Sequence, residues 1–421
     1  MEESKEWYVG VDWASENHHV LVMNENGRKI GERIFKHGGE GLSAMTTWIM
    51  AISGAEQSSQ VKIAIEVTSG PIVETLMERG FRVYSINPKQ MDRLRDRFTL
   101  AGAKDDSRDA EVMASCLRTD ERLYRLLAET DPVIIELREW SRMADDLTAE
   151  STRLTNRMRH QLWRYFPAML ALKPDLNAEW FLDLWETAPT PEKAMRVRER
   201  TVARLLKKGR VRRFNADEVL GILRQCPVYV APGTTEAAVA HIKVLVERIR
   251  LTNRQLADAH KHIDILTARL IPESEAAGSE QKVQRDVEIL ASLPGVGRIV
   301  LATLLAEASD ALQRRDYPAL RTLAGVAPVT KRSGKMYNVV RRYACNHRLA
   351  VAIYHWARVA VQRDLVCHAK YAALRARGHT HGRTLRQIGD YLLNIACGML
   401  KTKTTFKSPE TTASNLQPDP T

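Results

Sequence analysis

Four carboxylates in the N-terminal part of the sequence are spaced so that a fold could gather them. Asp12 and Glu66 each stand at the end of a short apolar run. A carboxylate at the end of a buried strand costs free energy unless it is paired or binds a metal. Asp106 and Asp109 are three residues apart, which puts both on one face of a helix. Carboxylates suit phosphodiester cleavage, in which two Mg²⁺ ions about 4 Å apart can hold the attacking and leaving oxygens.

Each of these carboxylates also has an ordinary structural explanation. Asp12 could cap a turn, Glu66 could pair with a basic neighbour, and Asp106 with Asp109 could cap a helix start. For any one residue the two interpretations are equally good. Four such residues in this order favour a metal site, and Asp105 is an alternative ligand to Asp106.

A serine near the other end of the chain is a candidate nucleophile. Ser333 precedes a glycine and is flanked by Lys331, Arg332 and Lys335. A serine hydroxyl is a poor nucleophile unless a base, a metal or a positive field activates it. The cations would anchor a scissile phosphate and stabilise its charge. Ser-Gly is also a common loop pair, so spacing alone does not make Ser333 catalytic.

A second candidate for phosphate contact is the turn LPGVG, which contains Gly295 and Gly297. It separates two helical patterns and would expose backbone N–H groups at a helix N-terminus, where phosphate can bind. The alternative is a plain packing corner between two helices.

The elements that must position the four acids follow the order of a ribonuclease H-like α/β domain: three strands, then helix, strand, helix and strand. The expected strands are 7–13, 19–24, 28–36, 61–67 and 81–86, and the expected helices are about 41–53 and 71–79. Apolar residues after Asp109 predict a further helix. In such a domain the strands that end at Asp12 and Glu66 are neighbours.

Two heptad stripes then predict long helices that pair antiparallel or form intermolecular coiled-coil contacts, although an ordinary helical bundle is nearly as good an explanation. The first stripe is Leu137, Trp140, Ala144, Leu147, Leu154, Met158 and Tyr165, and the second is Ile242, Leu245, Ile249, Thr252, Leu256, Ala259, Ile263, Leu266 and Leu270. The expected layout is an acidic domain at 1–130, a coiled-coil region at 131–282 with a helical insertion at about 167–235, a mainly α-helical domain at 283–402 and a disordered tail at 403–421.

Composition points to a nucleic-acid partner. The formal net charge is +12 and the isoelectric point is about 9.5, as in proteins that bind acidic polymers. The five cysteines are scattered and odd in number, which argues against a disulfide framework. The sequence shows no signal peptide and no apolar run that could cross a membrane, so we expect a cytoplasmic, nucleoid-associated protein.

Taken together, these motifs resemble the DEDD transposases of the insertion-sequence-110 group. The resemblance rests on GVDWAS, IEVTSG, KDDSRDAEVMA, LPGVG, LLAEASD, LAGVAPVTKRSG and CNHRLA, in this order and at both ends of the chain. It implies a RuvC-like domain in which Asp12, Glu66, Asp106 and Asp109 hold Mg²⁺ ions. It also implies that Ser333 attacks DNA and forms a transient phosphoserine link.

The same resemblance implies partners. They are double-stranded donor and target DNA, a bridge RNA that pairs with both, and homodimers that assemble into tetramers with active sites shared between protomers. The sequence departs from the family at three places: Asp105 replaces the usual Thr, Cys345-Asn346 replaces Gly-Asn, and the insertion lengthens the middle.

Two other functions remain open on the sequence alone. The first is a junction-resolving nuclease in which water attacks the DNA and Ser333 is structural. The second is a catalytically inert nucleic-acid-binding protein on the same scaffold. A sugar-kinase-type ATPase is disfavoured, because the Gly-rich phosphate loops that it needs after the first strand are absent.

Overall fold

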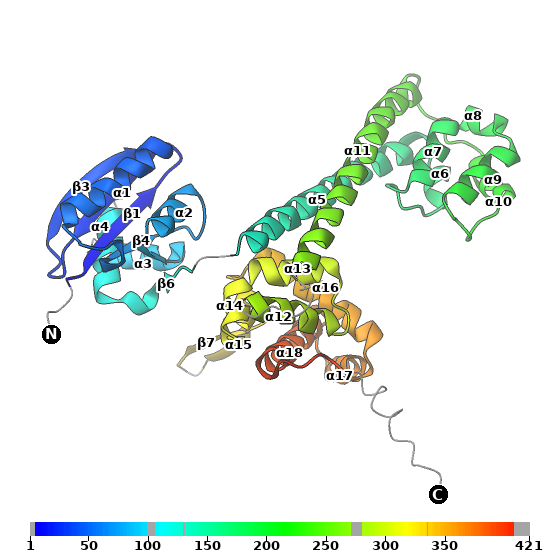
Figure 1. Ribbon diagram of the computed structural model, residues 1–421. Coiled ribbons are helices and arrows are strands. Elements are labelled where there is room, and N and C mark those ends of the chain that lie inside the picture. Colours follow the sequence, from blue (N-terminus) through cyan, green and yellow to red (C-terminus); the bar gives the residue numbers. More distant parts are fainter. Residues whose placement is uncertain (1–4, 99–105, 129–130, 271–279, 335, 408–421) are drawn as a thin grey trace, which may run out of the picture. The chain divides into compact units, whose positions relative to one another are not determined.

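The computed structural model describes residues 5–98, 106–128, 131–270, 280–334 and 336–407. The chain divides into two compact units, residues 1–129 and 130–421, each with its own hydrophobic clusters (Figure 1). Most of the predicted disordered tail, residues 408–421, lies outside the described residues.

The N-terminal unit is built on a six-stranded mixed sheet in the order β3-β2-β1-β4-β5-β6. The strands are β1 (Trp7–Trp13), β2 (Asn17–Met23), β3 (Lys29–Lys36), β4 (Val61–Ile65), β5 (Arg82–Ser85) and β6 (Arg125–Leu126). Strands β1 to β3 form an antiparallel meander, and β4 pairs parallel with both β1 and β5. The predicted adjacency of the first and fourth strands is therefore confirmed.

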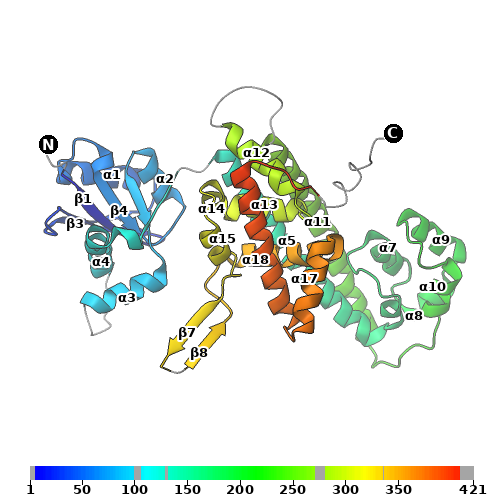
Figure 2. The same cartoon turned by 90° about the horizontal axis from the view of Figure 1, so that it is seen from below.

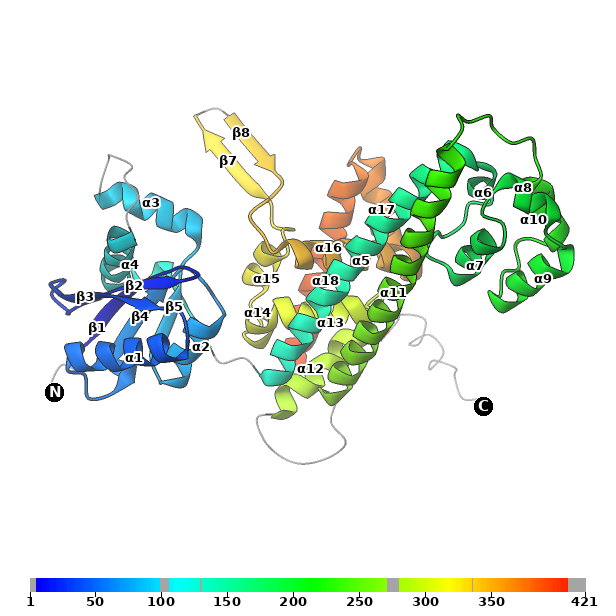
Figure 3. The same cartoon turned by 90° about the horizontal axis from the view of Figure 1, so that it is seen from above.

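Helices cover both faces of this sheet, as the alternation of apolar side chains requires. They are α1 (Gly39–Ser53), α2 (Pro71–Glu78), α3 (Pro88–Phe98) and α4 (Asp106–Thr119). Val9 and Val11 pack with α1 and α2 on one face, whereas Tyr8 packs with α4 on the other. Figure 3 shows α1 and α4 on opposite sides of the sheet.

Glycine lets α4 approach the sheet closely. A Cβ atom on Gly10 of β1 would stand 1.8 Å from the carbonyl oxygen of Ala110 in α4. No side chain larger than hydrogen fits there, so the α4 backbone lies directly against β1. This contact fixes the start of α4 beside the end of β1 that carries Asp12.

The C-terminal unit is organised around two long helices, α5 (Pro132–Tyr165) and α11 (Thr234–Arg269), which lie side by side (Figure 1). They run antiparallel, because Leu137 shares a cluster with Leu266, and Leu162 shares another with Ile242. The two predicted stripes thus pair within one chain. An ion pair between Glu150 and Arg248 (2.8 Å) crosses the pair near its middle.

The predicted insertion between the long helices is helical. It contains α6 (Ala168–Ala171), α7 (Glu179–Thr187), α8 (Pro191–Arg196), α9 (Glu199–Lys208) and α10 (Ala216–Leu223). Its core includes Phe181, Trp185 and Val219, packed against the end of α5 and the start of α11. Tyr165, the last residue of α5, donates its hydroxyl proton to the carbonyl of Pro189 (2.8 Å) and accepts from the indole of Trp185 (2.9 Å).

The remaining elements share one core with the opposite end of the long helices. They are α12 (Glu280–Ser292), α13 (Arg298–Glu307), α14 (Ser309–Gln313), α15 (Tyr317–Leu323), α16 (His347–Arg363), α17 (Leu365–Ala376) and α18 (His381–Thr402). Ile134 and Ile263 belong to the same cluster as Trp356 and Leu392. The predicted regions 131–282 and 283–402 therefore form one unit. None of the helices that the structure describes is long and apolar enough to span a membrane.

The segment around Ser333, which lies in the region predicted to be mainly α-helical, is an antiparallel hairpin of β7 (Val329–Ser333) and β8 (Met336–Val340). It extends beyond the helices of its unit in two views (Figures 2 and 3). From Thr330 onward, every described residue of the two strands is exposed. Strands exposed on both faces lack the apolar alternation that identifies a half-buried strand, so the sequence pattern concealed them.

Candidate functional site

Strand register places Asp12 and Glu66 side by side. Val11 pairs with Ile65 in the parallel β1–β4 ladder, and Asp12 and Glu66 are the next residue on each chain. Alternation along the strands directs both side chains to the sheet face that α4 covers. Both residues make polar interactions of their own, and both side chains are partly exposed.

Helix α4 brings the third carboxylate to the same edge. Asp109 is buried, with 3% of its side chain exposed, one residue before the Ala110 carbonyl that touches Gly10. Asp106 is the first residue of α4, one turn earlier, and its side chain lies outside the described part of the structure, as does Asp105.

Arg95 of α3 links two of these carboxylates. Its guanidinium donates Nε–H to Asp109 Oδ1 (2.5 Å) and Nη2–H to Asp109 Oδ2 (2.8 Å). The same Nη2 lies 3.6 Å from Glu66 Oε1. The hydrogen bonds to Asp109 raise the pKa of Arg95 and outweigh the opposing effect of burial. A full positive charge is thus held between carboxylates that come from β4 and α4.

A second polar group borders this edge. Asp12 faces His19 across the β1–β2 ladder, and His19 Nε2 lies 2.5 Å from Glu32 Oε1 of β3. Glu32 also accepts hydrogen bonds from Lys29 and Ser107, which together lower its pKa to about 2. Glu32 therefore remains ionised across the neutral range, and it ties β3 to the first turn of α4.

The sequence did not predict that Arg95, His19 and Glu32 belong to this site. The only signal for His19 was the Asn24–Gly27 turn, which sets the hairpin register that pairs it with Asp12. Gly27 has φ +77° there, and Asn24 Oδ1 accepts from the amides of Asn26 and Arg28. Nothing in the pattern around Arg95 singles it out.

The ligand types suit a divalent cation, but Arg95 neutralises part of the set and the carboxylates are not closely grouped in the described residues. Among the described residues, no three histidine, cysteine, aspartate or glutamate side chains are grouped closely enough to hold a metal ion. The hard oxygens of Asp12, Glu66 and Asp109 nonetheless come from one sheet edge and one helix face, and Asp109 already has a cation as its partner.

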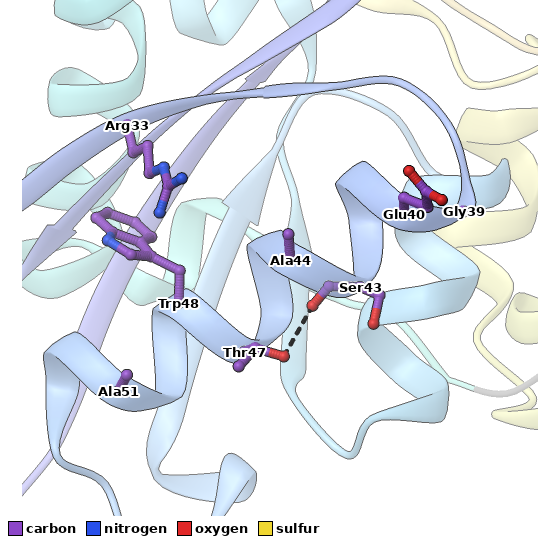
Figure 4. A pocket seen from close by; sticks show the side chains of 8 residues that line it. All are labelled: Arg33, Gly39, Glu40, Ser43, Ala44, Thr47, Trp48 and Ala51. Atoms are coloured by element: carbon purple, nitrogen blue, oxygen red, sulfur yellow. Dashed lines mark hydrogen bonds between the residues drawn. The ribbon is translucent and has the colours of Figure 1, made fainter.

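An open hollow of about 700 Å³ in the same unit is unrelated to these carboxylates. Arg33, Thr47 and Trp48 line it together with other residues of α1 (Figure 4). It lies on the α1 face of the sheet, whereas Asp12 and Glu66 point to the α4 face. Its side chains offer no carboxylate pair, so it adds no ligand to the site.

The predicted nucleophile belongs to the C-terminal unit. Ser333 ends β7 at the tip of the exposed hairpin, followed by Gly334 at φ +55°. Register pairs Ser333 with Met336 and Lys331 with Asn338, so Ser333 and Lys331 share one face of the hairpin and Arg332 lies on the other. Lys335 lies outside the described residues.

The two glycines predicted to contact phosphate have different surroundings. A Cβ atom on Gly295, at φ +82°, would lie 2.8 Å from the backbone nitrogen of Ala360, so this glycine serves the close packing of the turn on α16. The indole of Trp356 donates to the carbonyl of Pro294 (2.9 Å) and holds the same corner. Gly297 is exposed and is the N-cap residue of α13. The contact of either glycine with phosphate stays a prediction.

Hydrogen bonds of Asn346 hold the turn at Cys345-Asn346 in place. Asn346 Oδ1 accepts from the amide of Leu349 (3.0 Å) and caps α16. Its Nδ2 donates to Glu307 Oε2 (2.7 Å), and Glu307 also pairs with Arg142 of α5 (2.9 Å). This network joins α5, α13 and α16 below the hairpin.

Comparison with known proteins gives two matches to transposase families. Residues 9–167 match a DEDD family of IS110-type elements described as "Transposase", and residues 287–372 match "Transposase IS116/IS110/IS902 family". Together the matched segments cover more than half of the chain. The first contains Asp12, Glu66, Asp106 and Asp109, and the second contains Ser333.

Individual relatives agree with these matches. The chain is 64% identical over 236 residues to the putative transposase y4uE of Sinorhizobium fredii, covering 56% of this chain but only 64%, less than two thirds, of that relative. It is 28% identical to the mini-circle putative transposase for IS117 of Streptomyces coelicolor over 99% of both chains. An IS110 protein of the same organism is 26% identical over 95% of both. In both matched segments the chain is thus similar to transposases of IS110-type elements and of the IS116/IS110/IS902 family.

Proposed function

We propose that the protein is a DNA transposase/recombinase that excises and inserts a mobile element by metal-dependent strand cleavage and exchange. The observation that carries this proposal is the gathering of Asp12, Glu66 and Asp109 at one edge of the sheet, with Arg95 bridging two of them. A strand order of three antiparallel strands followed by parallel β4 and β5 supports a ribonuclease H-like, RuvC-like domain.

In this proposal Asp12, Glu66, Asp106 and Asp109 are the metal ligands. Two bound Mg²⁺ ions would stabilise the negative charge that develops on the oxygens of the scissile phosphate. The protein's own contribution is to hold the carboxylates in place. The Gly10 contact fixes α4 against β1, and Glu32 fixes the first turn of α4 through Ser107.

Ser333 is the nucleophile of the proposed reaction. Its Oγ forms a bond to phosphorus while one phosphorus–oxygen bond of the DNA breaks, so the number of phosphoester bonds is conserved. The hydroxyl proton leaves Ser333, and the released DNA oxygen takes up a proton. Lys331, on the same hairpin face, would neutralise the phosphate. Attack by a DNA hydroxyl on the phosphoserine then rejoins the strands and restores the serine.

We further propose, from the family alone, that a bridge RNA pairs with donor and target DNA, and that dimers and tetramers bring Ser333 of one protomer to the carboxylates of another. The exposed position of the hairpin is compatible with such sharing. The rival that deserves a test is a nuclease in which water attacks and Ser333 only shapes the turn.

Trapping the protein–DNA adduct in denaturant tests the proposal. We expect the full-length protein with Mg²⁺ and substrate DNA to form an adduct, Ser333→Ala to form none, and Asp12→Asn to lose metal-dependent cleavage, all with unchanged circular dichroism. Thr330→Ala, a change to another exposed hydroxyl of β7, is the matched control and should keep the adduct. Cleavage by Ser333→Ala at the wild-type rate would favour the water-dependent nuclease.

A further inference from the structure

The β7–β8 hairpin has a second face that the proposed chemistry does not use. Arg332 pairs with Tyr337 across the ladder, one step from the Ser333–Met336 pair. Because neighbouring residues of a strand point to opposite faces, Arg332 and Tyr337 lie together on the face opposite Ser333. An aromatic ring and a guanidinium thus stand next to the tip of the hairpin.

This face exposes large apolar and aromatic side chains to solvent. Tyr337 is 66% exposed and Val339, two residues further along the same face, is 52% exposed. Tyr343, just beyond the hairpin, is 80% exposed and has the guanidinium of Arg341 5.1 Å from its ring centroid. Contiguous exposed apolar surface marks an interaction site, and an isolated two-stranded hairpin is only marginally stable without a partner.

The charge around the hairpin identifies the partner as a polyanion. Between Asp316 and Asp364 the sequence contains no aspartate or glutamate, but it contains nine lysines and arginines. Two of these, Arg321 and Arg348, pair with carboxylates of other helices. An acid-free basic stretch suits a phosphate backbone. Exposed aromatic rings next to arginines are typical of surfaces on which unpaired bases stack, because every base presents a π-face.

We propose that Tyr337, supported by Arg332, is a stacking platform for an unpaired DNA base close to the strand that Ser333 attacks. The inference rests on the proposed function in one respect, since it takes DNA as the substrate at the hairpin. The ring stacks on the base, and the Arg332 guanidinium binds the adjoining phosphate. The platform selects DNA that is locally unpaired, as it is when strands are exchanged, over an intact duplex.

Binding of the full-length protein to labelled oligonucleotides of about 16 nucleotides tests the inference by fluorescence anisotropy. The probes are a single DNA strand, the duplex and the RNA of the same sequence. We expect Tyr337→Ala to weaken single-stranded DNA binding by roughly 5- to 100-fold and duplex binding by far less. Tyr337→Phe keeps the ring and should bind as the wild type does. Tyr229→Ala, which removes a 94% exposed tyrosine elsewhere, is the control.

Four results would overturn the inference. Tyr337→Ala could leave single-stranded DNA binding unchanged, or weaken duplex binding equally. It could weaken RNA binding alone, which would assign the face to RNA. It could alter the oligomeric state in light scattering with no effect on binding, which would make the face a protein contact. If the wild-type protein bound no nucleic acid, the proposed function itself would fail. If the Ser333 adduct formed but Tyr337→Ala had no effect on binding, only this inference would fail.

Discussion

Arg95 occupies the position of a counter-ion among the predicted metal ligands. Its guanidinium pairs with Asp109 in two hydrogen bonds and lies 3.6 Å from Glu66. A divalent cation that binds these carboxylates must replace the guanidinium, so part of the binding free energy is spent on breaking the pair. Charge-assisted pairs of this kind are worth about 1.5–3 kcal/mol.

Removal of Arg95 should therefore strengthen metal binding. We expect Arg95→Ala to raise the affinity of the full-length protein for Mn²⁺, a spectroscopically useful substitute for Mg²⁺, by about 10- to 150-fold in isothermal titration calorimetry without DNA. Arg93→Ala, on the same helix and exposed, is the control and should leave the affinity unchanged. A weaker Mn²⁺ affinity in Arg95→Ala would show that the arginine orients the carboxylates instead of competing for them.

Sequence alone predicted part of this site and missed part for a clear reason. Asp12 and Glu66 could be placed together because each ends a short apolar strand, and such strands pair side by side. Arg95 could not, because its partner depends on how α3 is oriented against α4, and no periodicity encodes that orientation. His19 and Glu32 depend on hairpin register, which a one-residue shift would reverse.

At the scale of elements, a buried carboxylate holds the helices together below the hairpin. Glu307 has 7% of its side chain exposed and accepts hydrogen bonds from Arg142 of α5 and Asn346 at the start of α16. Burial alone would raise the pKa of Glu307, but these two partners outweigh it and the pKa falls below its ordinary value of 4.5. The contact is present while Glu307 is ionised.

The stability of the C-terminal unit should follow this ionisation. A carboxylate whose pKa is lowered on folding contributes stability above its unfolded value, here 4.5, and that contribution is lost as the pH falls through the folded value. We expect Glu307→Gln to lower the free energy of unfolding at pH 7 by about 1.5–3 kcal/mol and by progressively less below pH 4.5. Urea titrations at several pH values measure this; a pH-independent difference would assign the effect to packing.

Elements differ in how visible they are in the sequence. Strands β1 to β5 and helices α5 and α11 were predicted, because long or buried segments show a strong period, whereas the two-residue, exposed β6 was not. The β7–β8 hairpin was not predicted, because the segment from Lys331 to Gly334 resembles a loop and the two strands of the hairpin have no buried face. The helix-rich prediction for 283–402 is otherwise confirmed by α12 to α18.

At the scale of the whole molecule, charge should govern nucleic-acid affinity. The net charge of +12 and the acid-free stretch 317–363 predict a steep salt dependence. We expect Lys331→Gln to reduce the slope of log K against log salt by about 1, as one lost phosphate contact does. Lys208→Gln is the matched control, since Lys208 of the insertion pairs with Asp183 and should leave the slope unchanged. Equal slopes for both variants and the wild type would remove Lys331 from the DNA interface.

Domain organisation was only partly readable from the sequence. One end of each long helix belongs to the core of the C-terminal helices, through Leu137 and Ala144 of α5 and Ile263 and Leu266 of α11. Further along α5, Leu154 and Met158 belong to the core of the insertion. A heptad stripe reports that a helix has an apolar face. It does not report which neighbours cover that face along its length.

The α5–α11 pair sets the spacing between the two hydrophobic cores of the C-terminal unit. Its 34-residue and 36-residue helices rise about 1.5 Å per residue, so each is about 50 Å long, and each end is embedded in a different core. Removal of seven residues from each helix would bring the two cores about 10 Å closer together and would nearly preserve their relative rotation about the helix axis. Removal of five residues from each would instead rotate one core relative to the other by more than a quarter of a turn. Distance and angular phase between these two bodies are thus separately adjustable in this architecture.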